Sequence, residues 1–124
     1  MSLVARHLEA NGIATVIMGC ARDIVESAGV ARFYWSDFPL GNSAGKPGDI
    51  ASQTDTVRGA LRLFDEATTP RTTAVSPQRW AEDETWKLDF MNVERLSADD
   101  IARMKADFQA QKDTANRIKA GQDA

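Results

Sequence analysis

The chain has 124 residues, 43% of them hydrophobic, and a formal net charge of −3 from 15 Lys and Arg against 18 Asp and Glu. This length suits one compact domain with a modest core and a tail. No run of basic residues alternates with aromatic ones, so the composition argues against a nucleic-acid partner. The longest apolar run, at 13–18, is too short to cross a bilayer. Because Arg6, His7 and Glu9 stand where a signal peptide has its apolar core, we expect a cytoplasmic protein with no membrane partner.

Cysteine and histidine each occur once, as Cys20 and His7. One cysteine excludes an internal disulfide and a cysteine metal cage, and one histidine excludes a histidine cluster. The phosphate loop of nucleotide hydrolases needs four residues between its first glycine and Gly-Lys, followed by Ser or Thr. Here only three residues separate the corresponding glycines, and Pro47 follows Lys46. We therefore expect no metal and no cofactor.

The first seventy residues alternate between helical and strand patterns. The run at 13–18 is continuously apolar and rich in β-branched side chains, which is typical of a strand buried on both faces of a parallel sheet. The alternation predicts a small three-layer α/β fold of the flavodoxin or Rossmann type. Two strands make an incomplete sheet, so part of it is missing or supplied by another chain. The predicted elements are a helix at 3–8, a strand at 13–18, a helix at 21–28, a strand at 31–35 and a helix at 50–64.

The C-terminal half divides into an irregular segment and one long helix. Ser76-Pro77 resembles a helix cap followed by a first-turn proline, which predicts a short helix there. Ser97 with Asp100 approximates a capping box and opens a helix with 3-4 apolar spacing. The apolar side chains of such a seam are expected to pack against another part of the same domain or against another chain. The expected divisions are an α/β region at 1–70, an irregular segment with Trp80 and Trp86 at 71–96, and an amphipathic helix at 97–120.

The stretch at 36–49 joins an aromatic strand to a helix start and contains three glycines, two prolines and Lys46. Glycines there can adopt backbone angles closed to other residues, and prolines fix the directions of entry and exit. The N–H groups that open the next helix, beside the Lys46 ammonium, favour an anion such as a substrate carboxylate. The same glycines and prolines equally fit a plain turn or a subunit contact.

Four short stretches of the chain resemble the selenoprotein B components of the glycine, sarcosine and betaine reductases and of D-proline reductase. They lie at 12–17, 21–24, 37–42 and 45–48, and the similarity extends over roughly residues 3–67, about half the chain. Members of that family reductively split a C–N bond at the α carbon of an amino acid or betaine, with a selenocysteine or cysteine just upstream of the first matched helix. This sequence has no counterpart to that residue. The resemblance implies an oxidoreductase and leaves open which thiol reacts.

Cys20 is the candidate for that thiol, unless another chain supplies it or the domain is not a reductase. It lies where the first strand is expected to end and the next helix to begin. This is the edge at which α/β proteins bind ligands, and a helix N-terminus lowers a thiol pKa. Isolated cysteines are otherwise small buried hydrophobic residues. The expected substrate-binding residues are Arg22, Asp23, Asp37, Gly41, Asn42, Lys46 and Gly48.

Two functions of different classes follow from these features. The first is a reductase component that acts on glycine, betaine or proline type substrates with a thiol or disulfide redox partner. Arg22 and Asp23 could then bind the two charges of a zwitterion, although they equally fit solvated residues of a first helical turn. Trp80 and Trp86 could stack on a quaternary ammonium, or simply fasten an irregular segment to the core. The second function is a non-catalytic α/β module that oligomerises or binds a partner subunit through the 97–120 helix and an open sheet edge.

Overall fold

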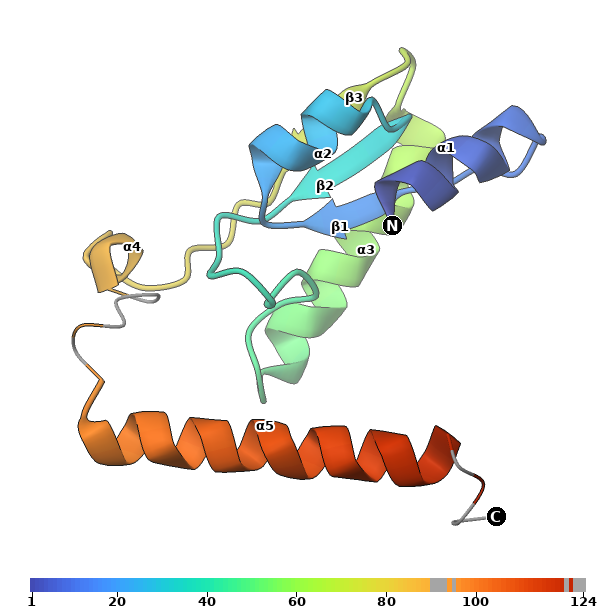
Figure 1. Ribbon diagram of the computed structural model, residues 1–124. Helices are drawn as coiled ribbons and strands as arrows, with labels where there is room; N and C mark the ends of the chain where they lie inside the picture. Colours follow the sequence, from blue (N-terminus) through green and yellow to red (C-terminus); the bar gives the residue numbers. More distant parts are fainter. Residues whose placement is uncertain (90–93, 95, 120, 122–124) are drawn as a thin grey trace. The chain divides into compact units, whose positions relative to one another are not determined.

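The computed structural model describes residues 1–89, 94, 96–119 and 121, and the chain forms two compact units, Met1–Lys87 and Leu88–Ala124 (Figure 1). The first unit is a small mixed α/β unit, and the second contains one long helix. No helix within the described ranges has the length and apolar character needed to span a membrane. In chain order the elements are α1 (Ser2–Ala10), β1 (Ile17–Gly19), α2 (Arg22–Ala28), β2 (Arg32–Trp35), α3 (Ile50–Glu66), β3 (Thr72–Val75), α4 (Trp86–Asp89) and α5 (Ala98–Lys119).

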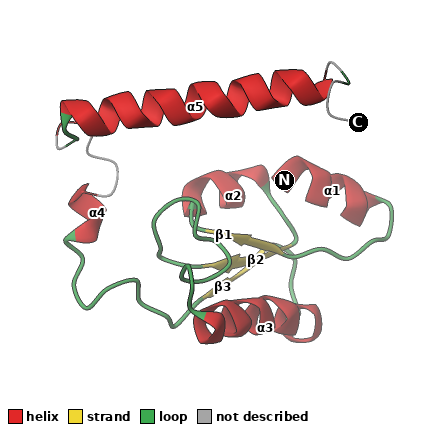
Figure 2. Cartoon of the chain, turned by 90° about the horizontal axis from the view of Figure 1, so that it is seen from below, coloured by secondary structure: helices red, strands yellow, loops and turns green. Residues whose placement is uncertain are grey.

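The sheet of the first unit has three parallel strands in the order β1-β2-β3. Successive side chains of β2 point to opposite faces. Phe33, only 1% exposed, packs with Ala5 of α1 and Val25 of α2 on one face, while Tyr34 packs with Ala60 and Leu63 of α3 on the other. Helices α1 and α2 therefore cover one face of the sheet and α3 covers the other (Figure 2).

The connections between the strands have an unusual topology. The strand order runs straight across the sheet, yet the crossover through α2 and the crossover through α3 lie on opposite faces. One crossover must then be right-handed and the other left-handed, although about 98% of such crossovers in proteins are right-handed. Doubly wound sheets place helices on both faces by reversing the strand order, and they bind ligands at the reversal. The described strands contain no such reversal.

Strand β1 is shorter than the strand predicted at 13–18, because side chains take over the hydrogen bonding at its start. The Glu9 carboxylate accepts hydrogen bonds from the backbone N–H and the hydroxyl of Thr15, the latter at 2.9 Å. The Arg32 guanidinium donates a hydrogen bond to the same carboxylate oxygen at 3.0 Å. Thr15 therefore bonds to α1 instead of to a neighbouring strand, and regular pairing begins only at Ile17.

Strand β3 lies in the segment at 71–96 that the sequence predicted to be irregular. Its ends are fixed by backbone bonds to β2, from Thr72 N to the Ala31 carbonyl (3.1 Å) and from Ser76 N to the Trp35 carbonyl (2.7 Å). The prediction of a short helix at Ser76-Pro77 is wrong. Ser76 continues the strand pairing by one residue, and its Oγ accepts a hydrogen bond from the backbone N–H of Gln78, which forms a turn.

Helix α3 begins at the predicted cap, since the Asp49 carboxylate accepts the N–H of Ser52 at 2.9 Å. Gly59 in its middle makes room for the ring of Tyr34, because a Cβ there would lie 2.4 Å from the Tyr34 hydroxyl oxygen. A glycine inside a helix is normally unfavourable. Here it lets the helix approach the sheet closely.

The second unit confirms the predicted capping box and long helix. The Ser97 hydroxyl accepts the backbone N–H of Asp100 at 3.1 Å, and the Asp100 carboxylate accepts the N–H of Ser97 at 3.4 Å. Of its apolar seam residues, Met104, Phe108 and Ile118 are 56%, 68% and 63% exposed.

Candidate functional site

Three segments that carry polar and aromatic side chains leave the sheet at the same edge (Figure 1). Because all strands are parallel, their carboxyl ends lie together. Cys20 follows β1, the loop at 36–49 follows β2, and the segment at 76–87 follows β3. We call this region the carboxyl edge. The residues that the sequence selected lie in the segments that follow β1 and β2, and two that it did not select, Gln78 and Lys87, lie in the segment that follows β3.

Cys20 is half-buried, and the backbone N–H groups of Phe38 and Asn42, which donate to the carbonyls of Ser36 and Pro39, lie near its sulfur. The indole N–H of Trp35 donates to the carbonyl of Cys20 at 2.9 Å. Burial raises the pKa of the thiol, the two N–H groups lower it, the negative charge of Asp37 raises it, and the net result is a raised pKa. The expectation that the start of α2 would lower this pKa is therefore wrong. The thiol is mostly protonated at neutral pH and is a weak nucleophile.

The loop at 36–49 is packed firmly on the start of α3. Gly45 has φ +99°, and a Cβ there would lie 2.7 Å from the backbone of Gln53. The backbone N–H of Lys46 donates to Ser52 Oγ at 3.0 Å, and the Gln53 side chain donates to the Lys46 carbonyl at 3.1 Å. Gly41 and Gly48 also have positive φ but face open space. Within the described residues the ammonium of Lys46 makes no hydrogen bond or ion pair, so it is free to meet a ligand.

Arg22 and Asp23 open α2 beside Cys20, as the sequence predicted. Arg22 pairs with Glu26 at 3.0 Å, and its guanidinium lies 5.1 Å above the ring of Trp35. The same Trp35 side chain donates a hydrogen bond to the Cys20 carbonyl, so it contacts both Arg22 and Cys20. Asp23 is exposed in the first turn of α2.

A row of aromatic rings and an ion pair fasten the segment at 76–87 to the loop. Lys87 contacts Asp37 at 2.7 Å, across 50 residues of sequence. The rings of Phe38 and Trp80 lie 5.4 Å apart, and those of Trp80 and Trp86 lie 6.4 Å apart. Asp37, Trp80, Trp86 and Lys87 are among the residues that line a hollow of about 90 Å³. Its lining carries both charges and two indole faces, a combination that suits a small polar molecule.

Beneath this hollow lies a buried polar cluster around Gln78. The Gln78 side chain donates to the carbonyl of Ser52 at 3.1 Å and to the hydroxyl of Thr56 at 3.0 Å. Ser76, 6% exposed, and Ser36, 0% exposed, lie at the neighbouring strand ends. The hydroxyl of Ser36 has no hydrogen-bond partner within the described part of the chain. Gln78 therefore anchors the segment after β3 to the start of α3.

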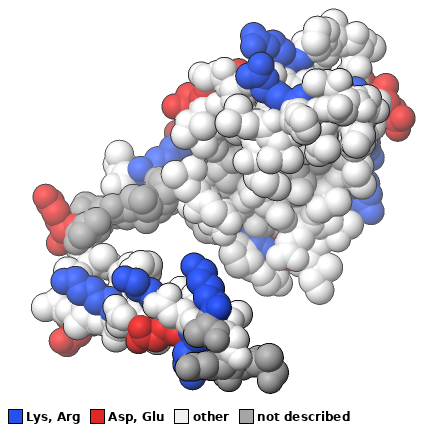
Figure 3. Space-filling view, turned by 45° about the vertical axis from the view of Figure 1, so that its right-hand side comes forward, with Lys and Arg blue, Asp and Glu red and all other residues white. Residues whose placement is uncertain are grey.

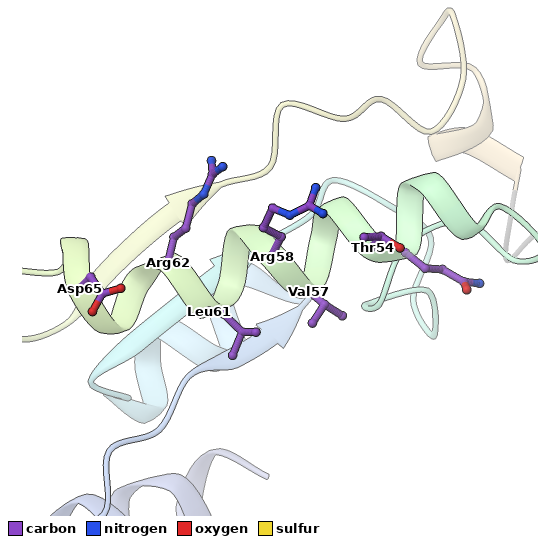
Figure 4. A pocket seen from close by; sticks show the side chains of 7 residues that line it. Thr54, Val57, Arg58, Leu61, Arg62 and Asp65 are labelled. Atoms are coloured by element: carbon purple, nitrogen blue, oxygen red, sulfur yellow. The ribbon is translucent and has the colours of Figure 1, made fainter.

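A larger hollow of about 620 Å³ runs along the outer face of α3, from Gln53 to Asp65 (Figure 4). Every residue that lines it belongs to α3, so it is an open groove on one helix. Its apolar residues include Val57 and Leu61, and Arg58 and Arg62 lie beside them. A groove of this kind suits contact with another protein better than catalysis.

Charged side chains are scattered over the visible face of the molecule, and they do not gather into one basic band there (Figure 3). Among the described residues, no group of three or more His, Cys, Asp or Glu side chains is placed to hold a metal ion. No protein-family model matches the chain, and neither the curated proteins nor the solved structures that were compared contain a match. The resemblance to reductase components therefore rests on the loop and strand residues alone.

Proposed function

We propose that this chain is a cytoplasmic component of a reductase of the glycine, betaine or D-proline type. It binds a small amino-acid-like substrate at the carboxyl edge. One observation carries the proposal: the loop at 37–42, which bears the resemblance, leaves the sheet at the same edge as Cys20. Helices on both faces give the parallel sheet three layers, but its unreversed strand order with crossovers on opposite faces departs from the flavodoxin and Rossmann types.

The reducing thiols in this proposal belong to a partner chain. Reductive cleavage replaces a C–N bond with a C–H bond, and it takes up two electrons and two protons as the amine leaves. Two thiols supply the two electrons and two protons when they form a disulfide. This chain has only one cysteine, so it cannot supply them alone. Burial also raises the pKa of Cys20, which disfavours its thiolate. Cys20 therefore lies beside the substrate, and the partner provides the redox pair.

The carboxyl edge offers groups for both charges of a zwitterionic substrate. Lys46, whose ammonium has no partner among the described residues, receives the carboxylate. Asp37 receives the substrate ammonium and exchanges its contact with Lys87 for the ligand. Asn42 and the loop glycines Gly41 and Gly48 set the loop shape, while Arg22 and Asp23 border the site at the start of α2.

Calorimetric titration with glycine, sarcosine, betaine and D-proline tests this assignment. We expect one of them to bind the native chain, and Lys46→Gln to weaken that binding at least about tenfold, because a charged hydrogen bond contributes about 1.5–3 kcal/mol. Lys105→Gln, on the exposed surface of α5, is the matched control and should bind normally. Absence of binding, or equal binding by Lys46→Gln, would contradict the substrate site.

A second function, a non-catalytic module that assembles with another chain, is favoured by the outer face of α3. Val57, Leu61 and Phe64 are 41%, 55% and 39% exposed on a helix whose opposite face is buried. Contiguous exposed apolar side chains of this kind mark protein contact sites. If assembly is the function, the chain forms a defined oligomer in sedimentation experiments and binds none of the four compounds. A monomer that binds one of them would reject it.

A further inference from the structure

Helix α5 carries apolar side chains at the spacing of a two-stranded coiled coil. In that structure a seven-residue repeat, with positions named a to g, places apolar residues at a and d against the partner helix. With Ile101 at a, the a and d positions of α5 form a seam, and their occupants are Ile101, Met104, Phe108, Gln111, Ala115 and Ile118. Two hollows of about 490 and 420 Å³ follow this seam, lined by residues of the second unit alone. This face of α5 can receive another helix.

Charges of opposite sign flank the seam on its two sides. Position e is always lysine along α5, and position g is aspartate twice and threonine once: Lys105, Lys112 and Lys119 at e, and Asp100, Asp107 and Thr114 at g. Among the described residues, the side chains of the three lysines and of Asp107 make no hydrogen bond or ion pair. Asp100 differs, because its carboxylate bonds to Ser97 and Arg103 of its own helix. Asp107 and the lysines are therefore free to pair with charges of another helix.

This charge pattern fits a second copy of α5 in the parallel orientation. In a parallel pair, each g residue faces the e residue of the next repeat on the partner helix, so Asp107 of each copy meets Lys112 of the other. In an antiparallel pair, e faces e and g faces g, which sets lysine against lysine and aspartate against aspartate. The polar position in the seam favours the same arrangement. When parallel helices are in register, Gln111 faces Gln111, and the two amides can hydrogen-bond to each other.

We infer that the seam of α5 pairs with the same seam of a second copy of this chain, as a parallel two-stranded coiled coil in register. The inference rests on the assembly function proposed above and names its partner, and it involves neither the carboxyl edge nor α3. From Ile101 to Ile118 the seam covers about two and a half repeats, fewer than the roughly three to four that identify a long coiled coil. The dimer is therefore weak, and its population rises with protein concentration.

Sedimentation equilibrium of the full chain, from about 1 µM to about 1 mM, tests the pairing. We expect monomers that associate to dimers. Phe108→Ala should raise the dissociation constant at least about tenfold, because it truncates a large apolar side chain in the middle of the seam. Gln109→Ala is the matched control, since Gln109 is the next residue, at position b outside the seam, and it should leave the dimer unchanged. Alanine favours a helix at both positions, so loss of helix does not explain a difference between them.

A charge exchange tests whether Asp107 and Lys112 pair between copies. Asp107→Lys alone sets two cations against each other and should raise the dissociation constant about fivefold, since each exposed ion pair is weak and the two-fold axis provides two of them. The double variant with Lys112→Asp reverses both signs and should restore the dimer. Asp113→Lys is the matched control, because it makes the same charge change at position f, on the side away from the seam, and it should leave the dimer unchanged.

Disulfide trapping reads the orientation of the two helices directly. In the parallel arrangement Ile118 of each copy lies opposite Ile118 of the other, within the Cα separation that a disulfide spans. In an antiparallel arrangement it would lie near the opposite end of the partner helix. We expect Ile118→Cys, made together with Cys20→Ser, to form a disulfide-linked dimer readily in a glutathione buffer. Asn116→Cys in the same background is the matched control, since position b lies outside the seam, and it should crosslink far less.

The outcomes distinguish the coiled coil from the assembly function. A native chain that stays monomeric up to about 1 mM overturns both. An oligomer that Phe108→Ala leaves unchanged overturns the pairing of α5 and leaves the assembly function standing. A dimer that Phe108→Ala weakens, but in which the charge exchange has no effect and Ile118→Cys crosslinks no better than its control, overturns the parallel arrangement. A dimer that Phe108→Ala weakens, that the double charge variant restores and that Ile118→Cys traps supports the inference.

Discussion

At the scale of single residues, the half-buried Cys20 lies beside the loop that follows β2. Burial and the charge of Asp37 raise the pKa of its thiol, and the nearby N–H groups of Phe38 and Asn42 lower it, with a net rise. Gly45 completes the arrangement, because its missing side chain lets the loop touch the first turn of α3. Substitution of Cys20 or Gly45 should therefore change the conformation of the loop more than that of the sheet.

The two glycines Gly45 and Gly41 allow a matched test of this packing. Both have φ near +100°, but a Cβ would meet the Gln53 backbone at 2.7 Å only at Gly45. We expect Gly41→Ala to cost about 1 kcal/mol of unfolding free energy, from backbone strain alone. Gly45→Ala should cost about 3 kcal/mol or more, since strain and the clash add. Urea unfolding measures both, and equal losses would mean that the contact with α3 is unimportant.

At the scale of elements, local signals predicted the longer helices, whereas the short helix expected at Ser76-Pro77 is absent from the described structure and α4 was not predicted. The caps Asp49 and Ser97 act within three residues, so the sequence alone located the starts of α3 and α5. Strand β3 was missed because its polar, threonine-rich sequence forms a strand only by pairing with β2. The early part of the predicted 13–18 strand was lost to a side-chain network that no sequence pattern signals.

That network, in which Glu9 binds Thr15 and Arg32, predicts a pH-dependent link between α1 and the sheet. Burial raises the pKa of Glu9, but hydrogen bonds from Thr15 and the charge of Arg32 lower it further, so the net pKa is lowered. A lowered carboxylate pKa stabilises the fold above the pKa of the unfolded state, and the stabilisation is lost as the pH falls through the folded pKa.

Glu9→Gln should therefore lower the unfolding free energy by about 1–2 kcal/mol at pH 7. In acid, where the native Glu9 is protonated as well, the difference between variant and native chain should disappear. Urea unfolding at both pH values measures it. Glu66→Gln, at the exposed end of α3, is the control and should have little effect at either pH. A Glu9→Gln effect that is independent of pH would contradict the role of the charge.

At the scale of the whole molecule, the candidate site combines residues that are distant in sequence. Parallel strands bring their carboxyl ends together, which is why the sequence could place Cys20 beside the loop at 36–49. Gln78 and Lys87 were missed because they contact Ser52 and Asp37 across 26 and 50 residues, with no local pattern to signal it. These two contacts join the segment after β3 to the start of α3 and to the loop at 36–49.

Timed alkylation of Cys20 across pH, with and without glycine, sarcosine, betaine and D-proline, tests the proposed substrate site most directly. Because burial raises the thiol pKa, labelling should be slow at neutral pH and accelerate only in alkaline solution, above the range of an ordinary thiol. One of the four compounds should slow it further, since a substrate at the carboxyl edge covers the sulfur. Labelling that none of the compounds affects at any pH would contradict a substrate site beside Cys20.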